Sequence, residues 1–393
     1  MSLELSKKAA AVKPSSTLAI TAKAKELREQ GKDVVGFGAG EPDFNTPDHI
    51  CDAAIDAIRA GFTKYTPASG TNELKEAVCK KFKQFNGLEY QPDQIVISNG
   101  GKHSLTNIFT ALLNPGDEVL IPQPSYVSYE PCAILAGAKP VIIDLKAENE
   151  FRLTAQELEE VITDRSKVLI LPYPNNPTGA IMEREDLEAI AEVIRRHDLI
   201  VMSDEIYGEL TYKGKHVSIA SLPGMKERTI LINGFSKAYA MTGWRLGYAC
   251  GPTDIIGQMT KIHQFAIMCA PTTSQYAAVE ALKNGDDDIA EMCKAYNQRR
   301  RYLLHAFREM GLECFEPYGA FYVFPCIRQF GMTSDEFASR FLAEEKVAVV
   351  PGTAFGDSGE GFLRISYAYS LENLKVAIAR LERFVKKLRD ERS

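Results

Sequence analysis

Short apolar runs alternate with amphipathic segments through the first two thirds of the chain. The runs DQIVIS, EVLIP, KPVIIDL, KVLILPYP, LIVMSDE and TILING are rich in Ile, Leu and Val, which is typical of buried strands. The segments NELKEAVCKKFKQFNG, GGKHSLTNIFTALLN and REDLEAIAEVIRRHD have the apolar spacing of helices. Buried strands separated by helices form parallel sheets that are covered on both faces. The pattern therefore predicts an α/β protein with a mainly parallel sheet covered by helices.

The rhythm changes after about Asn284. One long helical segment, DDIAEMCKAYNQRRRYLLHAFREMG, precedes the strand-like runs AFYVFP, VAVVP and FLRISYA. The helical segments SDEFASRFLAEE and LENLKVAIARLERFVKKL accompany these strands. We expect a large domain over residues 45–285, and a smaller α/β domain formed by residues 286–393 together with the N-terminal segment 1–44.

Composition and charge exclude several classes of protein. The chain has 393 residues, of which 45% are hydrophobic and 25% charged, and its net charge of −6 argues against a nucleic-acid surface. The longest charge-free stretch is interrupted by Pro271 and polar residues, and the N-terminus lacks the apolar core of a signal peptide, so we expect no membrane span. Eight scattered cysteines without a CxxC pair indicate free thiols in a reducing cytoplasm.

Two glycine-containing stretches are candidates for binding phosphate. Gly100 and Gly101 follow the run IVIS and open a predicted helix, so they either expose backbone amides to an anion or form a simple turn. The stretch VVGFGAGEPDF lacks the last glycine of a dinucleotide loop, because Glu41 stands there, and Pro42 and Pro47 interrupt the helix start. A Rossmann dehydrogenase is therefore disfavoured.

Two further strand ends carry polar side chains. Asn176, in LPYPNNPTG, is either part of a turn or an amide donor at the sheet edge. Asp204 and Glu205, in IVMSDEIYGEL, have no accompanying His or Cys cluster, so we expect no metal site. The alternative is that one carboxylate pairs with a cationic ring nitrogen, with Tyr207 nearby.

The stretch NGFSKAYAMTGWRLGYACG keeps two cations among small and apolar residues. An amine such as that of Lys237, if desolvated near another cation, loses its proton and forms a Schiff base. The planar fork of Arg245 suits a phosphate. A lysine, an arginine and a carboxylate such as Asp204 together meet the demands of pyridoxal phosphate, whose protonated ring is an electron sink.

Six motifs now carry a resemblance to a known family. They are GEPDF, KYTPASG, NNPTG, SDEIY, SKAYAMTGWRLGY and FLRISYA, in this order. The chain resembles, nearly end to end, the fold-type-I pyridoxal-phosphate aminotransferases of class I, in their bacterial aspartate/aromatic branch. The resemblance implies that the sheet is mixed, and it implies a cytoplasmic enzyme that moves the amino group of an L-amino acid to a 2-oxo acid such as 2-oxoglutarate.

The resemblance implies three catalytic residues. Lys237 would bond the cofactor aldehyde and shuttle the substrate proton, and Asp204 would pair with the pyridinium nitrogen. Tyr207, together with Asn176, would hydrogen-bond the phenolic oxygen of the ring.

Further residues would hold the cofactor. Tyr126 would stack on the ring, in a run SYVSY where this branch often carries Trp. Tyr65 would reach the phosphate across a dimer interface, which implies a homodimer with shared active sites. The remaining phosphate contacts implied by the resemblance are Gly100, Gly101, Lys102, Ser236 and Arg245.

The resemblance also assigns the contacts of the substrate. Arg364 would grip the α-carboxylate, and Gly40 would lie against the substrate on a closing segment, beside Tyr126 and Asn176. These assignments apply to any amino acid and do not select the side chain.

Substrate choice depends on the groups that meet the distal end of the substrate. Ser15, Thr17 and Lys102 would meet a second carboxylate. Lys13 either occupies the position associated with prephenate as acceptor or is a solvated surface lysine. We expect aspartate and glutamate to be preferred, with aromatic amino acids second.

Three other functions share part of this pattern. A β-lyase would use Lys237, Asp204 and Arg245 but release ammonia and pyruvate. A pyridoxal-binding transcription regulator would need an added DNA-binding domain, for which the segment before Gly40 leaves no room. A scaffold would not require Lys237.

Overall fold

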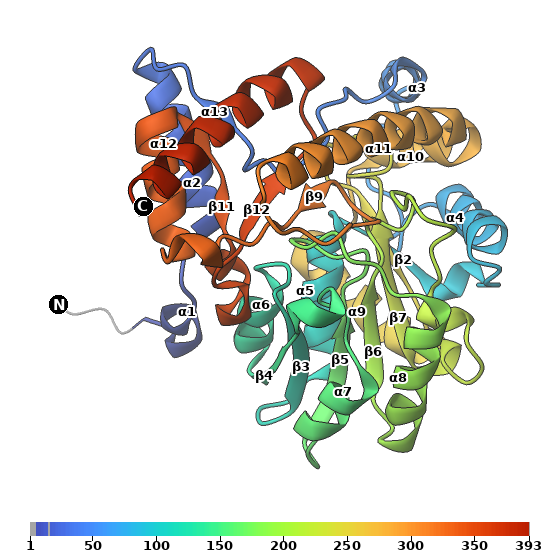
Figure 1. The fold of residues 1–393 in the computed structure, drawn as a ribbon. Helices are drawn as coiled ribbons and strands as arrows, with labels where there is room; N and C mark the ends of the chain where they lie inside the picture. Colours follow the sequence, from blue (N-terminus) through green and yellow to red (C-terminus); the bar gives the residue numbers. More distant parts are fainter. Residues whose placement is uncertain (1–4, 15, 393) are drawn as a thin grey trace.

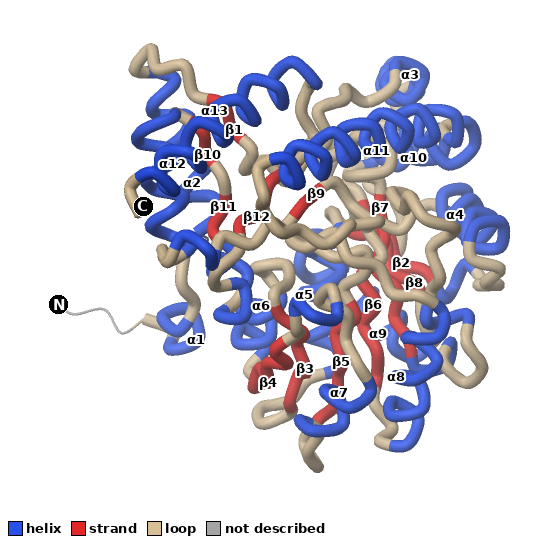
Figure 2. The backbone as a smooth tube through the Cα atoms, viewed as in Figure 1, coloured by secondary structure: helices blue, strands red, loops and turns tan. Residues whose placement is uncertain are grey.

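The main sheet has seven strands in the order β2-β8-β7-β6-β5-β3-β4 (Figure 2). The computed structural model describes residues 5–14 and 16–392. Neighbouring strands from β4 to β7 pair in parallel, whereas β8 runs antiparallel to both β7 and β2. This confirms the predicted mainly parallel, mixed sheet. The strands are β2 (Ile95–Ser98), β3 (Glu118–Gln123), β4 (Lys139–Asp144), β5 (Ser166–Leu171), β6 (Ile200–Asp204), β7 (Thr229–Gly234) and β8 (Gly247–Cys250).

Both faces of the sheet are buried, which explains the continuous apolar runs of the sequence. In β5, Val168 and Ile170 pack against one layer of helices, and Leu169 and Leu171 pack against the other. Figure 1 shows α7 and α8 in front of the sheet and α5 and α9 behind it. The covering helices are α5 (Gly101–Leu112), α6 (Tyr129–Ala136) and α9 (Thr253–Ile267) on one face, and α7 (Ala155–Val161) and α8 (Arg184–Arg196) on the other.

Three more helices pack beside the edge strand β2. Thr71 caps the first of them by accepting a hydrogen bond from the Leu74 amide. Its apolar stripe, which includes Val78 and Phe82, joins the core under β2 and β8. These helices are α3 (Asp48–Arg59), α4 (Asn72–Phe85) and α10 (Thr272–Asn284).

The C-terminal part forms two small sheets. Strands β9 (Tyr322–Val323), β11 (Val350–Pro351) and β12 (Leu363–Ser366) form one sheet in the order β11-β12-β9. In the other, β1 (Val35–Gly36) pairs in parallel with β10 (Val347–Ala348), which joins the N-terminal segment to the C-terminal part.

Long helices surround these small sheets. In Figure 1 the blue helix α2 lies beside the red helices α12 and α13. The short helix α1 instead contacts α6 of the main sheet layer. These helices are α1 (Lys7–Ala11), α2 (Ser16–Glu29), α11 (Asp286–Glu309), α12 (Ser334–Glu345) and α13 (Leu371–Asp390). Across the described ranges 5–14 and 16–392, no helix has the length and apolar character needed to span a bilayer.

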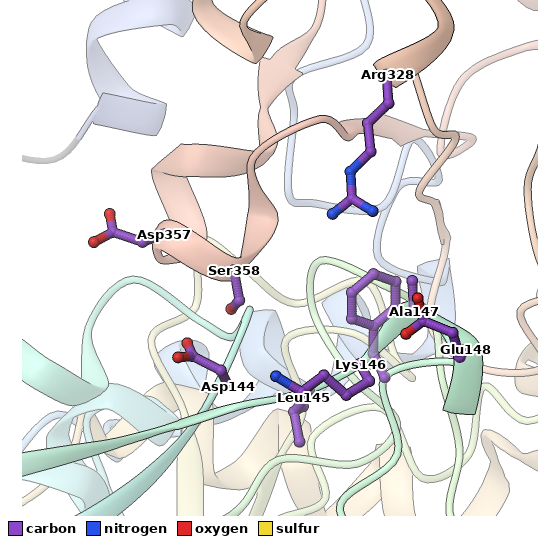
Figure 3. A pocket seen from close by; sticks show the side chains of 9 residues that line it. Asp144, Leu145, Lys146, Ala147, Glu148, Arg328, Asp357 and Ser358 are labelled. Carbon is purple, nitrogen blue, oxygen red and sulfur yellow. The ribbon is translucent and has the colours of Figure 1, made fainter.

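Two hollows are large enough to hold a small molecule. The smaller, of about 380 Å³, lies beside the end of β4, and Figure 3 shows that charged side chains of both signs surround it. Its charged residues Asp144, Lys146, Glu148, Arg328 and Asp357 are all exposed to solvent. The larger lies at the carboxyl ends of the central strands, where sites form in open α/β sheets.

Candidate active site

Most of the predicted site residues meet in the larger cavity, which has a volume of about 740 Å³. The chain segments that leave the carboxyl ends of β5, β6 and β7 bring Asn176, Asp204 and Lys237 to its wall. The predicted residues that line it are Lys13, Gly40, Gly101, Lys102, Tyr126, Asn176, Asp204, Tyr207, Ser236, Lys237, Arg245 and Arg364.

Two predicted residues are not among those that line this cavity, and the side chains of two others are not described by the structure. Gly100 lies directly before α5 and packs against Arg245. The side chain of Tyr65 is 82% exposed and lies away from the cavity. Ser15 lies outside the described residues, and Thr17 lies in α2 with a side chain that is likewise outside them.

Basic side chains outnumber acidic ones around the cavity. Lys13, Lys102, Lys237, Arg245 and Arg364 line it, against the two carboxylates Glu41 and Asp204. The described hydrogen bonds of the last three cations go to neutral carbonyl or amide oxygens and not to carboxylates. A concave surface with an excess of positive charge favours an anionic ligand.

Lys237 is placed by the loop after β7, and its amine donates to the carbonyl of Gly40. Burial lowers the pKa of this amine to about 8. Glu41 and Asp204 favour the charged form, while Arg364 and Arg245 oppose it. A large fraction of the amine is therefore neutral near pH 8, which is the state in which a lysine attacks a carbonyl carbon.

Asp204 ends β6, and its side chain is held on both oxygens. One oxygen accepts from the Tyr129 hydroxyl at 2.8 Å, and the other accepts from the Ile206 amide at 3.3 Å. Burial raises the pKa of Asp204, and the hydrogen bond from Tyr129 opposes this rise. A cationic nitrogen beside Asp204 would offset the cost of burying the carboxylate.

The start of α5 and the loop around Arg245 form a cradle for an anion. The helix begins without a side-chain cap, and the amides of Gly101 and Lys102 have no described hydrogen-bond partner. Gly100 has φ of 83°, and a Cβ atom there would lie 2.4 Å from Nη2 of Arg245. Only glycine lets the guanidinium approach the helix start this closely. Lys102 extends over the Tyr126 ring, with its amine 5.5 Å from the ring centre.

Arg364 is held flat in the cavity wall. Its guanidinium carbon lies 4.7 Å from the ring centre of Tyr322 and 4.9 Å from that of Phe355. Nη1 donates to the Asn176 side chain at 3.1 Å and Nη2 to the Gly38 carbonyl at 2.7 Å, whereas Nε is buried and has no described partner. A planar, oriented guanidinium with a free donor suits a carboxylate.

Sequence reasoning assigned no role to two tyrosines of this site. Tyr129 contacts Asp204, and the Tyr322 hydroxyl lies 2.9 Å from the hydroxyl of Tyr207. The one signal in the sequence was the spacing of Tyr126 and Tyr129, which stack edge to face at the start of α6 with ring centres 5.5 Å apart.

The residues present fit pyridoxal phosphate. Lys237 supplies an amine of lowered pKa, and Asp204 supplies a carboxylate without a cationic partner. The start of α5 supplies an anion site in which a side chain at position 100 would clash with Arg245. Among residues 5–14 and 16–392, no group of three or more His, Cys, Asp or Glu side chains could hold a metal ion.

The chain is similar to known aminotransferases. Residues 32–381 match the family model described as aminotransferase class I and II. The chain is 45% identical to an aspartate aminotransferase of Bacillus subtilis, over 98% of this chain and 100% of that protein. It is also 45% identical to aromatic-amino-acid aminotransferase 2 of Thermococcus litoralis, over 92% and 94% of the two chains. The solved aspartate aminotransferase of Thermus thermophilus with maleate superposes with a TM-score of 0.94, at 42% identity over 97% of this chain and 100% of that one.

Proposed function

The chain belongs to the class I and II aminotransferase family and is an aminotransferase, and from this membership we propose that it transfers the amino group of aspartate or glutamate to 2-oxoglutarate. The observation that carries the choice of substrate is the excess of cations in the cavity, which lie at two places. Arg364 belongs to β12 and contacts the rings of Tyr322 and Phe355, whereas Lys102 belongs to α5 and lies over the ring of Tyr126; Lys13 lines the same cavity. Two separated cationic places suit a substrate with two carboxylates.

Pyridoxal 5'-phosphate is the proposed cofactor, and when bound it supplies the electron sink that stabilises negative charge on the substrate α-carbon. Lys237 would hold its aldehyde carbon and would take the proton from the substrate α-carbon. Asp204, which Tyr129 positions, pairs with the ring nitrogen. Asn176 and Tyr207 bind the ring oxygen.

The phosphate of the cofactor is proposed to lie in the cradle at the start of α5. Arg245 supplies a charged fork, and the amides of the first helical turn supply neutral donors. Tyr126 provides the flat face on which the ring stacks. The proposed phosphate contacts are Gly100, Gly101, Lys102, Ser236 and Arg245.

Arg364 is proposed to bind the α-carboxylate of every substrate, with Gly40 opposite. Lys13 and the side chain of Lys102 bind the distal carboxylate, while the backbone amide of Lys102 contacts the phosphate, and Ser15 and Thr17 are proposed to assist at the distal carboxylate. The relative from Thermus thermophilus was solved with maleate, a small dicarboxylate. This supports the preference for dicarboxylic substrates.

A second candidate substrate class is aromatic amino acids or prephenate. Val12, Tyr126 and Phe355 line the cavity beside the basic residues, so part of the wall is apolar. Lys13 also lines the cavity, which is compatible with an acceptor that has an additional carboxylate.

A homodimer in the cytoplasm is the proposed assembly. Large apolar side chains are exposed along α3 and at the end of α9, including Ile58 at 54%, Phe62 at 48% and Phe265 at 83%. Tyr65, at 82% exposed, lies in the same part of the sequence as α3. Covering this surface with a second copy would bring Tyr65 to the phosphate of the partner's site.

The proposed division into a domain over 45–285 and one formed by 1–44 and 286–393 places the cavity between the two.

The first test is a single-turnover absorbance measurement on the purified yellow protein. L-aspartate, L-glutamate, L-tyrosine and L-cysteine are added in turn without an acceptor. Conversion of the cofactor to its amine form by aspartate and glutamate, without ammonia release, supports the proposal. Conversion chiefly by tyrosine would move the preference to aromatic substrates. Ammonia and pyruvate from cysteine, with no amine form, would indicate a lyase.

The matching variant is Lys237→Ala. We expect it to lose at least about 10³-fold in kcat/KM, because both the attachment and the proton transfer use this amine. Its absorbance should also change on loading with the cofactor, since no covalent bond to the protein forms. Retained transamination by this variant would refute the role of Lys237.

A further inference from the structure

A buried tyrosine contacts two residues that line the cavity. Tyr322 lies in β9 and is fully buried. Its hydroxyl lies 2.9 Å from the hydroxyl of Tyr207, and the guanidinium of Arg364 lies 4.7 Å from its ring centre. Tyr322 therefore contacts both the proposed donor to the cofactor ring oxygen and the proposed clamp of the substrate carboxylate.

The direction of the hydrogen bond between the two tyrosines follows from counting protons. A tyrosine hydroxyl has one proton to donate. If Tyr207 donates its proton to the cofactor ring oxygen, its own oxygen must accept from Tyr322. No other described side chain hydrogen-bonds the Tyr322 hydroxyl, so its proton is available for this bond.

Packing fixes the Tyr322 hydroxyl in place. A Cβ atom at Gly40 would lie 3.2 Å from it, so the absence of a side chain at Gly40 leaves just enough room. The rings of Tyr207 and Tyr322 meet edge to face at 5.9 Å. Burial of the Tyr322 ring and its contact with the Tyr207 ring hold the two hydroxyls together.

We propose that Tyr322 is a positioning residue that transmits the charge state of Arg364 to Tyr207, and through Tyr207 to the cofactor ring oxygen. This inference rests on the function proposed above. A hydroxyl that accepts a hydrogen bond becomes a stronger donor. The nearby cation polarises the Tyr322 hydroxyl: burial raises the pKa of Tyr322, and Arg364 opposes that rise. When the substrate carboxylate neutralises Arg364, Tyr322 and then Tyr207 become weaker donors.

A second connection runs in parallel. Arg364 also donates to Asn176, which is the other proposed partner of the ring oxygen. Removing the Tyr322 hydroxyl should therefore reduce, but not abolish, the coupling between Arg364 and the cofactor ring oxygen.

The experiment is a pH titration of the visible absorbance of the loaded enzyme. A donor to the anionic ring oxygen favours the deprotonated form of the cofactor and lowers the pH midpoint. Tyr322→Phe should raise this midpoint by about 0.3–0.6 pH units, and Tyr207→Phe should raise it more. Maleate, which has no amino group to transfer, should raise the midpoint of the wild type and raise that of Tyr322→Phe by less.

Two further variants separate this role from a structural one. In a Tyr207→Phe background, Tyr322→Phe should cause no additional shift, because it acts through Tyr207. The matched control is Tyr367→Phe, which removes a fully buried hydroxyl that donates to the Ala320 carbonyl at 3.1 Å. This control should leave the midpoint unchanged. If Tyr322→Phe does not fold, the maleate-induced shift is measured in Tyr207→Phe, where it should be smaller than in the wild type because the path through Tyr207 is missing.

The outcomes also distinguish failure of this inference from failure of the proposed function. A midpoint shift in Tyr207→Phe but none in Tyr322→Phe would overturn the inference alone. So would a Tyr322→Phe shift that persists in the Tyr207→Phe background. No shift in Tyr207→Phe would overturn both the inference and the proposed role of Tyr207.

Discussion

Two adjacent carboxylates at the end of β6 have opposite environments. Asp204 lies on the sheet face shared with Met202, and its oxygens accept one hydroxyl and one amide hydrogen bond. Glu205 lies on the other face and accepts from the hydroxyls of Ser203 and Ser218 and from the ring of His216 at 2.8 Å. Glu205 is buried and Asp204 is partly buried at the cavity wall, and of the two only Glu205 has a cationic side chain within ion-pair distance.

The difference indicates that Glu205 is structural and that Asp204 can bind a cationic ligand. The Glu205 cluster is satisfied by the chain itself, so it stabilises the turn after β6. Asp204 lacks a cation of its own, and its raised pKa records the cost of burying it. A buried carboxylate that the protein leaves incompletely paired at a cavity wall is a candidate for binding a cationic group.

The largest effect on activity is expected from substitution of Asp204. Asp204→Asn should lower kcat/KM by about 10³-fold, because the amide cannot hold a proton on the ring nitrogen. The stability of the protein without cofactor should stay the same or increase, because the uncompensated buried charge is gone. Steady-state kinetics and thermal unfolding of the cofactor-free protein test the two statements. A loss of activity below about tenfold would contradict the assignment.

Substitution of Glu205 should instead reduce stability more than activity. Glu205→Gln should lower the free energy of unfolding by about 3 kcal/mol, because His216 is left buried without an anion. Its effect on kcat/KM should be smaller than that of Asp204→Asn. The control is Glu73→Gln, which breaks the exposed 2.8 Å pair with Lys283 and should cost less than about 1 kcal/mol. Urea unfolding of both variants provides the measurement.

The stabilisation by the Glu205–His216 pair should decrease as the pH rises. Burial alone would lower the pKa of His216, but the Glu205 carboxylate outweighs burial, and the pKa is raised. The stabilisation is then complete below the unfolded-state value of about 6.5 and is lost as the pH rises through the raised pKa. Wild type and Glu205→Gln should differ more in stability at pH 6 than at pH 9. A larger difference at pH 9 would mean that His216 is neutral in the folded protein.

The smallest effect is expected when only the hydrogen bond from Tyr129 to Asp204 is removed. Tyr129→Phe removes the hydroxyl that holds down the pKa of Asp204, so the acid limb of the kcat/KM profile should move up by about one pH unit. Tyr173→Phe, which removes a buried hydroxyl bonded to the Phe151 carbonyl, is the control and should leave the profile unchanged. An acid limb that stays in place would reduce Tyr129 to a packing role.

The fold was largely predictable because its strands are buried on both faces. Each of the six predicted runs in the main sheet overlaps an observed strand, because continuous apolar character can be recognised without the tertiary structure. Strand β8 was not singled out, because it has four residues, GYAC, at the end of a stretch read as the lysine loop. Its antiparallel pairing with β2 and β7 is a long-range property that local pattern does not encode.

Individual cavity residues were predictable where a motif ends a strand, as for Asp204 and Lys237. The contacts that tune them were not. Tyr129 meets Asp204 across 75 residues of chain, and Tyr322 meets Tyr207 across 115. A tyrosine in an apolar run is indistinguishable from a core residue until the partner of its hydroxyl is known.

The two-residue period of β6 also constrains how this gene can change over time. Ile200–Asp204 pairs in register with β5 and β7, so Met202 opposes Ile170 on one side and Ile230 on the other. Inserting or deleting one codon within the strand would turn every later side chain to the opposite face. Glu205 would then enter the cavity and Asp204 would face His216. Descendants of this gene should therefore accumulate substitutions in β6 while keeping its length, and length variation should be confined to the surface loops.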